Sequence, residues 1–269
     1  MKITRLFILM VLLSCLGCTN STLNETTIEN KQEGKIAEEP VDSALQAKVN
    51  AMLGVGYPRL NEENAVAFLA DWFEKTEERE VVIHTKHGDI FIDLFDETPL
   101  HTANFLYKVH RQYFAPCEFT RVVPEFVIQG GNSEEEEPQQ KRFFIGKHTL
   151  PSEFVPGLYH SRGSVAMSRG YSDNPDKRSS SYDFYIVTGR KISKVELAQI
   201  EHEKGISYTD AQKKLFRNVG GAPHLDFEHT VFGRVTKGMD VADKIAATPR
   251  DESDWPLEKL NLTIELVQD

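Results

Sequence analysis

The stretch FTRVVPEFVIQGGN, residues 119–132, places an arginine and a glutamine among strand-forming apolar residues. Phe126–Ile128 has the pattern of a half-buried strand, which residues 130–131, both glycine, are expected to end. Arg121 and Gln129 therefore put a guanidinium and an amide on a sheet surface that is otherwise apolar. The neighbouring segments indicate what such a surface is for.

Short strand candidates lie on both sides of this stretch. Before it, residues 81–95 alternate between apolar and polar, and Gly88-Asp89 is predicted to supply a hairpin turn. Pro99 opens a predicted helix with an apolar stripe. The later strand candidates are GSVAMS (163–168), DFYIVTG (183–189), HTVFGRVT (229–236) and LNLTIELV (260–267). Short strands with two or three helices predict a closed antiparallel barrel with helices over its ends.

The region 191–220 interrupts this pattern of strands. Ser193 and Glu196 have the spacing of a capping box, and Gly205 provides a stop for the helix that follows. A second helix is predicted at about Thr209–Asn218. We interpret the region as a helical hairpin inserted between two barrel strands. Because it has its own start and stop signals, we expect that a short turn could replace it without loss of the barrel.

Composition limits the classes of function. The chain has 269 residues, of which 40% are apolar, so it can fill one large core or two small ones. Its net charge of −10 argues against a nucleic-acid partner, because no basic field is available for phosphates. Only Cys117 lies in the predicted folded part, so no internal disulfide framework is expected.

The N-terminus has the features of an export signal. Lys2 and Arg5 precede an apolar run at residues 6–13, and this run is too short to span a bilayer. The cysteines directly after the run indicate a bacterial lipoprotein signal. A leucine three residues before Cys15 and a glycine directly before Cys18 favour different lipidation sites, and Cys15 is slightly preferred. The alternative is an ordinary secretory signal with incidental cysteines.

The chain therefore divides into four predicted regions: a lipoprotein signal with its lipidation site (1–18), a polar tether (19–40), a helical extension (41–79) and the barrel with its insertion (80–269). In the extension, one amphipathic helix is predicted within residues 42–53 and another within residues 61–78. We expect both helices to pack against the barrel domain. The alternative is a surface for a partner protein or a second copy.

Four motifs in order resemble those of the cyclophilins, a family of peptidyl-prolyl cis–trans isomerases. They are FTRVVPEFVIQGGN, GSVAMS, DFYIVTG and HLDFEHTVFGRVTKGMDVADKI, and the resemblance covers about residues 80–267. The resemblance implies a mainly β fold with some α structure: a closed eight-stranded antiparallel barrel, capped by two helices, with a proline site on its outer surface.

The chemistry of this reaction explains a guanidinium beside an apolar surface. Rotation about an X–Pro bond has a barrier of about 18–20 kcal/mol, because the nitrogen lone pair is delocalised into the carbonyl group. In the twisted transition state the lone pair returns to nitrogen, which then accepts a hydrogen bond. A fixed donor binds that state better than either planar ground state. No nucleophile, metal or cofactor is required.

The resemblance assigns roles to particular residues. Arg121 is implied as the donor, and Gln129 as a residue that orients Arg121 or binds the substrate backbone. The implied proline pocket has Phe126, Val127, Tyr185 and Leu225 as its walls and His229 at its rim. Ser168, Arg169 and Asp183 fall at the family's positions that contact the substrate.

Several positions depart from the family pattern. Asp183 stands where glutamine is usual, and Arg169 replaces an asparagine that binds the substrate backbone. Val127 stands where methionine is common, and His224 where some members carry a tryptophan important for cyclosporin binding. We expect Asp183 to face the proline groove, where it could pair with Arg121 or Arg169.

The leading prediction is a lipid-anchored isomerase of the bacterial cell envelope, facing the periplasm, that assists the folding of exported proteins and binds their proline-containing segments. The alternatives are a non-catalytic module that holds proline-containing segments and a scaffold that acts through its added helices. The segment SEEEEPQQ (133–140) is interpreted as a solvated acidic loop, with a metal or partner site as the alternative. The sequence contains no zinc-protease or P-loop motif.

Overall fold

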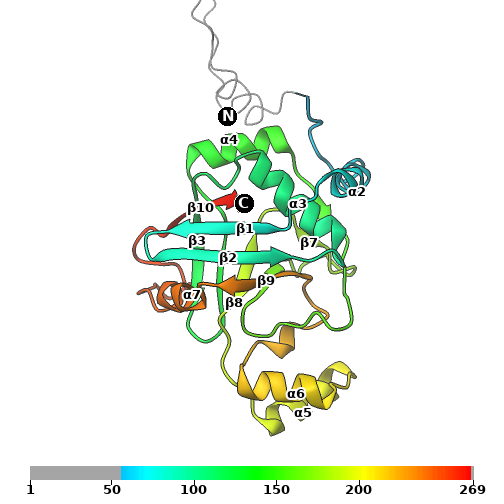
Figure 1. Cartoon of the computed structure of the whole chain (residues 1–269), viewed down its shortest axis with the longest axis vertical. Helices are drawn as coiled ribbons and strands as arrows, with labels where there is room; N and C mark the ends of the chain where they lie inside the picture. Colours follow the sequence, from blue (N-terminus) through cyan, green and yellow to red (C-terminus); the bar gives the residue numbers. More distant parts are fainter. Residues whose placement is uncertain (1–55, 268–269) are drawn as a thin grey trace, which may run out of the picture. The chain divides into compact units, whose positions relative to one another are not determined.

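The computed structural model describes residues 56–267 (Figure 1). The predicted lipidation sites Cys15 and Cys18, the tether at 19–40 and the first predicted helix of the extension lie outside the described residues. The predictions for these segments therefore stay predictions.

Eight strands form a closed barrel, as predicted, in the order β1-β10-β3-β4-β8-β6-β9-β2. Every neighbouring pair is antiparallel. The barrel strands are β1 (Glu80–Thr85), β2 (Gly88–Leu94), β3 (Cys117–Val123), β4 (Val127–Asn132), β6 (Ser164–Met167), β8 (Phe184–Val187), β9 (Val231–Lys237) and β10 (Asn261–Leu266). A separate two-stranded sheet pairs β5 (Thr149–Leu150) with β7 (Ser179–Ser180).

Two helices pack on opposite sides of the barrel strands in Figure 1, α3 (Pro99–His110) and α7 (Met239–Ala246). Proline begins α3 as predicted, since the first turn of a helix needs no N–H donor. The remaining helices are α2 (Ala65–Lys75), α4 (Glu136–Ile145), α5 (Lys194–Lys204), α6 (Asp210–Asn218) and the short 3₁₀ turn η1 (Pro223–Leu225).

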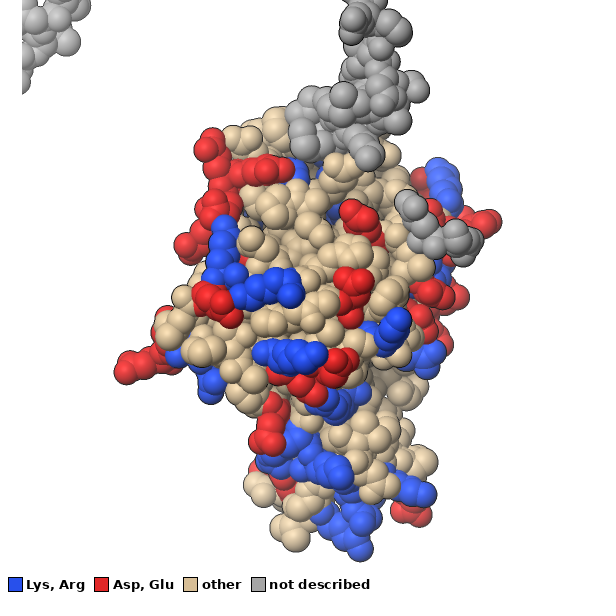
Figure 2. Space-filling view, turned by 60° about the vertical axis from the view of Figure 1, so that its left-hand side comes forward, with Lys and Arg blue, Asp and Glu red and all other residues tan. Residues whose placement is uncertain are grey.

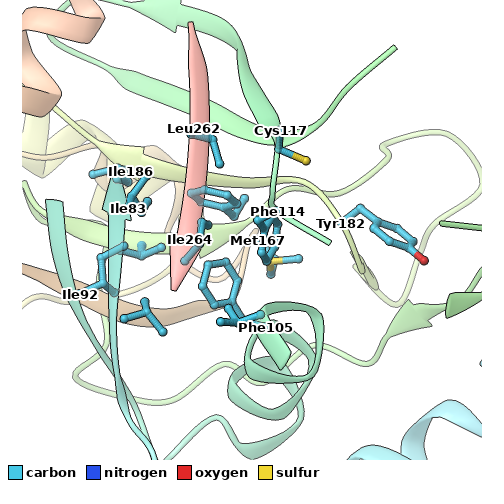
Figure 3. Close-up of a cluster of buried hydrophobic side chains, with 14 of the residues drawn as sticks. Ile83, Ile92, Phe105, Phe114, Cys117, Met167, Tyr182, Ile186, Leu262 and Ile264 are labelled. Carbon is cyan, nitrogen blue, oxygen red and sulfur yellow. The ribbon is translucent and has the colours of Figure 1, made fainter. Parts of the chain in front are cut away.

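The barrel interior and the inner face of α3 share one apolar core (Figure 3). Ile83, Ile92 and Ile186 enter it from the strands, and Phe105 enters it from the helix. Each of these side chains is at most 1% exposed. Burying one such side chain stabilises a fold by about 1.5–3 kcal/mol. Successive side chains of a strand point to opposite faces of the sheet. The residues between those that enter the core therefore point to the outside of the barrel.

Three local predictions are corrected by the structure. The hairpin turn lies at residues 86–87, because Thr85 pairs directly with Gly88. The glycine pair does not end its strand, since β4 continues to Asn132. The acidic segment is not a loop: from Glu136 it forms α4, and acidic side chains in the first turn favour a helix by opposing its dipole.

Glycine at position 131 is required by a close approach of the backbone. Gly131 has φ +93°, and a Cβ there would lie 2.4 Å from the Tyr182 carbonyl oxygen. The glycine at position 131 therefore marks a place where another backbone segment comes close to the strand, rather than the end of the strand.

The second predicted helix of the extension packs on the barrel domain, as expected. This helix is α2, whose Leu69 is fully buried. Trp72 and Phe68 contact the Tyr107 ring of α3 with centroid distances of 5.2 and 5.1 Å. The apolar face of α2 is thus covered by the same chain.

The predicted helical hairpin is present between β8 and β9, at the end of the domain marked α5 and α6 in Figure 1. The Ser193 hydroxyl caps α5, and Thr209 forms a complete capping box with Gln212 at the start of α6. A small core of its own joins Ile192, Leu197, Ile200, Tyr208 and Phe216. On the face seen in Figure 2, more Lys and Arg than Asp and Glu lie at this end of the molecule, in contrast to the chain's net charge of −10.

Candidate active site

The strand register aligns three of the predicted site residues in a row. Arg121 of β3 is opposite Gln129 of β4, and Gln129 is opposite Tyr185 of β8. The register shifts by one residue directly before Arg121, a bulge of the kind that redirects a side chain. Since the flanking residues Val122 and Ile186 enter the barrel core, this row lies on the outer surface.

A second apolar cluster, separate from the barrel core, surrounds this row. Its buried members are Val127, Ala166, Tyr185, Val187, Ala222, Leu225 and Val231, with Phe126, Phe95 and Leu158 packed at its edge. A cleft of about 130 Å³ opens above it. The cleft is lined by Arg121, Phe126, Val127, Gln129, Ser168, Arg169, Tyr171, Tyr185, Leu225 and His229. The structure thus brings together every predicted site residue of the barrel except Asp183.

The guanidinium of Arg121 is held at one side of the cleft. Its Nε and Nη2 donate to Asp254 Oδ2 at 3.3 and 3.1 Å. Its Cζ lies 5.8 Å from the centroid of the Phe126 ring, and that ring stacks on His224 at 5.3 Å. Within residues 56–267, Nη1 of Arg121 makes no hydrogen bond, so this nitrogen can donate to a molecule in the cleft.

The opposite rim is a network of polar side chains. Arg169 donates through Nη2 to Glu228 Oε2 at 2.7 Å and lies 4.2 Å above the Tyr171 ring. The Tyr171 hydroxyl is 2.8 Å from His229 Nε2, and His229 Nδ1 is 3.1 Å from the Met167 carbonyl oxygen. A carbonyl oxygen only accepts, so Nδ1 of His229 carries the proton and Tyr171 donates to Nε2.

Charge on this rim follows from burial and pairing. Burial and the neighbouring His160 lower the pKa of His229 to about 4, so its imidazole is neutral at pH 7. Burial alone would raise the pKa of Glu228, but hydrogen bonds from Lys177 and Arg169 lower it to about 2. Glu228 is therefore ionised and pairs with both Arg169 and Lys177.

Asp183 does not take the predicted position. Its Oδ2 accepts a hydrogen bond from the Ser180 hydroxyl at 2.8 Å, and it forms no ion pair with Arg121 or Arg169. The carboxylates that pair with those two guanidinium groups are Asp254 and Glu228.

Two residues of the site were not predicted. Asp254 comes from the loop before β10, and Tyr171 from the segment after β6. Neither lies in a strand or helix, so no periodicity marks it. Among residues 56–267, no group of three His, Cys, Asp or Glu side chains is arranged to hold a metal ion.

The chain is similar to one protein family and to named bacterial proteins. The profile of the family described as "Cyclophilin type peptidyl-prolyl cis-trans isomerase/CLD" matches residues 80–266. A protein of Staphylococcus saprophyticus, provisionally named a peptidyl-prolyl cis–trans isomerase, is 26% identical over 214 residues, covering 79% of this chain and 98% of that protein. A counterpart from Staphylococcus aureus strain USA300 is 27% identical over 202 residues, covering 75% of this chain and 92% of its own.

The chain is also similar to part of a longer protein and to a solved structure. A protein of Streptococcus pyogenes, provisionally named a bifunctional phosphatase/peptidyl-prolyl cis–trans isomerase, is 34% identical over 190 residues. The match covers 69% of this chain but only 38% of that protein. The crystal structure of a cyclophilin type isomerase from Cryptosporidium parvum, in the presence of the dipeptide Ala-Pro, has a TM-score of 0.50 at 22% identity. It covers 71% of this chain and all of that one, which shows a shared fold.

Proposed function

Since the chain belongs to the family of cyclophilin-type peptidyl-prolyl cis–trans isomerases, we propose that it isomerises X–Pro bonds, with Arg121 as the donor to the proline nitrogen. The observation that carries this proposal is the row of Arg121, Gln129 and Tyr185 beside the outer apolar cluster. This row puts a guanidinium next to a cleft that can hold a small apolar ring.

The proposed mechanism uses only differential hydrogen bonding. The proline ring enters the apolar cleft against Phe126 and Leu225, while the acyl side of the bond rotates in solvent. As the bond twists, the proline nitrogen becomes an acceptor, and Nη1 of Arg121 donates to it. Gln129 lies opposite Arg121 in the register and lines the cleft, where its amide can bind the substrate backbone. No bond to the substrate forms or breaks.

The test is an exchange assay on a short Ala-Pro peptide with the full chain purified in detergent. Arg121→Ala should lower kcat/KM by about tenfold or more, because the lost hydrogen bond is made mainly in the twisted state. Arg234→Ala is the matched control, since Arg234 pairs with Asp93 on β2 and does not line the cleft. Unchanged exchange in a folded Arg121→Ala protein would rule out the assigned role.

One observation favours a second candidate, a non-catalytic module that binds proline-containing segments. Asp254 occupies two of the Arg121 donor atoms, so these two nitrogens are engaged within the protein rather than with a substrate. The same assay separates the candidates: a binding module would take up the peptide, as seen in an NMR titration, without accelerating its exchange.

We further propose that the protein is a lipoprotein of the bacterial cell envelope that acts on exported proteins. The support is in the sequence, where Cys15 and Cys18 follow a short apolar run with two preceding basic residues. No helix within residues 56–267 is long and apolar enough to cross a membrane. Mass spectrometry of the native N-terminus should find an acylated cysteine at one of these two positions, and a product starting at an unmodified residue would refute the anchor.

A further inference from the structure

A buried chain of hydrogen bonds joins the helical hairpin to the floor of the cleft. The Tyr208 hydroxyl, from the hairpin, donates to Asp226 Oδ2 at 2.6 Å. The other carboxylate oxygen, Oδ1, lies 2.9 Å from His160 Nδ1 and accepts the His160 backbone N–H at 2.7 Å. The His160 Nε2 lies 3.0 Å from the Tyr185 hydroxyl. All four side chains are at most 5% exposed.

The chemistry of the groups fixes the direction of each bond. A carboxylate only accepts, so His160 carries its proton on Nδ1 and donates it to Asp226. With the proton on Nδ1, Nε2 of His160 is the acceptor to which the Tyr185 hydroxyl donates. Burial raises the pKa of both Tyr185 and Tyr208, which keeps both hydroxyl groups protonated. The Tyr208 hydroxyl also lies 3.3 Å from the Pro223 carbonyl oxygen, but the Asp226 carboxylate is the nearer acceptor.

Tyr185 is the end of this chain that meets the substrate. Its ring belongs to the outer apolar cluster and lines the cleft, while its hydroxyl is turned away to His160. The His160 and Tyr185 rings stack at 6.0 Å with an angle of 19° between their planes. A buried hydroxyl without a partner is costly, so the position of His160 determines where the Tyr185 ring can lie.

A second contact links the hairpin to the rim. Lys204, at the end of α5, donates to the Asp226 carbonyl oxygen at 3.0 Å and lies 3.5 Å from Glu228 Oε1. Glu228 in turn holds Arg169 through its other oxygen at 2.7 Å. The hairpin therefore contacts both supports of the cleft, the floor through Asp226 and the rim through Glu228.

We propose that the hairpin is a positioning element of the proline site, and that Tyr208, Asp226 and His160 are positioning residues that set the Tyr185 ring for the substrate. This inference rests on the proposed function. It bears on the replacement of the hairpin by a short turn: the buried Asp226 carboxylate would lose the Tyr208 donor, and the Asp226 carbonyl oxygen would lose the Lys204 donor. The hairpin has a core of its own, but it shares Asp226 with the site.

The test is a double-mutant cycle between Tyr208 and Tyr185, which Asp226 and His160 link by hydrogen bonds. Tyr208→Phe removes one hydroxyl and keeps the ring that packs on Phe216. In the parent protein it should raise the KM, and the Kd, for an Ala-Pro peptide by about three- to tenfold, with kcat changed less. In a Tyr185→Phe background the hydroxyl that bonds to His160 is absent. There, Tyr208→Phe should have little effect on KM and Kd.

A matched control is Tyr159→Phe. The Tyr159 ring lies 5.5 Å from that of Tyr208, but its hydroxyl makes no hydrogen bond within the described part of the chain. This variant should leave KM and Kd unchanged. If Tyr208→Phe acts equally in both backgrounds, Tyr208 does not act through Tyr185 and the proposal is wrong.

A readout without substrate separates this proposal from the isomerase assignment. In NMR spectra of the peptide-free protein, Tyr208→Phe should shift the His160 imidazole and Tyr185 ring resonances, whereas Tyr159→Phe should not. Shifts in a protein that fails to accelerate exchange would leave the positioning chain intact and refute only the proposed function. Unshifted resonances in an active protein would refute the positioning chain alone.

Discussion

Asp254 holds Arg121 from a loop that is remote in the sequence. The two residues are 133 positions apart, yet Asp254 Oδ2 accepts from both Nε and Nη2 of Arg121. A backbone hydrogen bond joins the loop to β3: Val122, the residue after Arg121, donates its N–H to the Asp254 carbonyl oxygen at 2.9 Å. The carboxylate therefore restricts the guanidinium of a side chain that is otherwise 40% exposed.

Asp254→Ala should lower kcat/KM for an Ala-Pro peptide by about three- to tenfold, mainly through kcat, because the freed guanidinium samples more rotamers. The peptide exchange assay measures it. Asp93→Ala removes the carboxylate of another surface ion pair, with Arg234, and should have no effect. An increase in kcat/KM for Asp254→Ala would mean that the ion pair competes with the substrate for Arg121.

Asp183→Gln should leave kcat/KM for the same neutral peptide unchanged or slightly higher. Asp183 does not line the cleft, and its carboxylate is bound to the Ser180 hydroxyl, an acceptor role that the glutamine amide oxygen can also fill. Kinetic measurement with a parallel thermal melt checks this prediction. A tenfold fall with unchanged stability would show that Asp183 reaches the substrate after all.

His148 should make the protein less stable in mild acid. Its burial, with the charges of Lys108 and Arg178, lowers its pKa to about 2. Below the pKa of a histidine in the unfolded chain, about 6.5, the unfolded state binds a proton that the folded state does not. Stability is therefore lost as pH falls from about 6.5, by about 2 kcal/mol at pH 5 from this residue.

The variant that tests this is His148→Gln, whose amide can still donate to Asn104 Oδ1 as the His148 Nε2 does at 3.2 Å. Urea unfolding at pH 7 and pH 5 should show a smaller loss of unfolding free energy in the variant, by about 2 kcal/mol. The remaining loss would come from groups such as His229. Identical losses in both proteins would contradict the assignment.

Gly131→Ala should destabilise the barrel more than Gly157→Ala. Both glycines have positive φ, +93° and +106°, so alanine is strained at either position. Only at Gly131 does an added Cβ meet other atoms, 2.4 Å from the Tyr182 carbonyl oxygen. We expect a loss of about 3 kcal/mol or more at Gly131 and about 1 kcal/mol at Gly157, measured by chemical unfolding. Equal losses would mean that the backbone at Gly131 can relax.

The sequence by itself determined the barrel, its order of motifs and most of the cleft. Alternation along DFYIVTG assigns Phe184 to the core and Tyr185 to the outer surface, since successive strand residues face opposite sides. Cap and stop residues likewise located the hairpin, because Ser193 and Gly205 act on backbone groups only a few residues away. These features depend on local geometry, which the sequence encodes directly.

Only the tertiary structure decided which charged and polar groups meet. Asp254, Tyr171 and Asp226 lie outside regular strands and helices, so no period marks them, and their partners are distant in the chain. For Asp183 we expected a pairing with Arg121 or Arg169, but in the structure those two side chains pair with Asp254 and Glu228, and Asp183 accepts from Ser180. Ion pairs and buried hydrogen bonds depend on the spatial arrangement of all competing groups, which exists only once the barrel has closed.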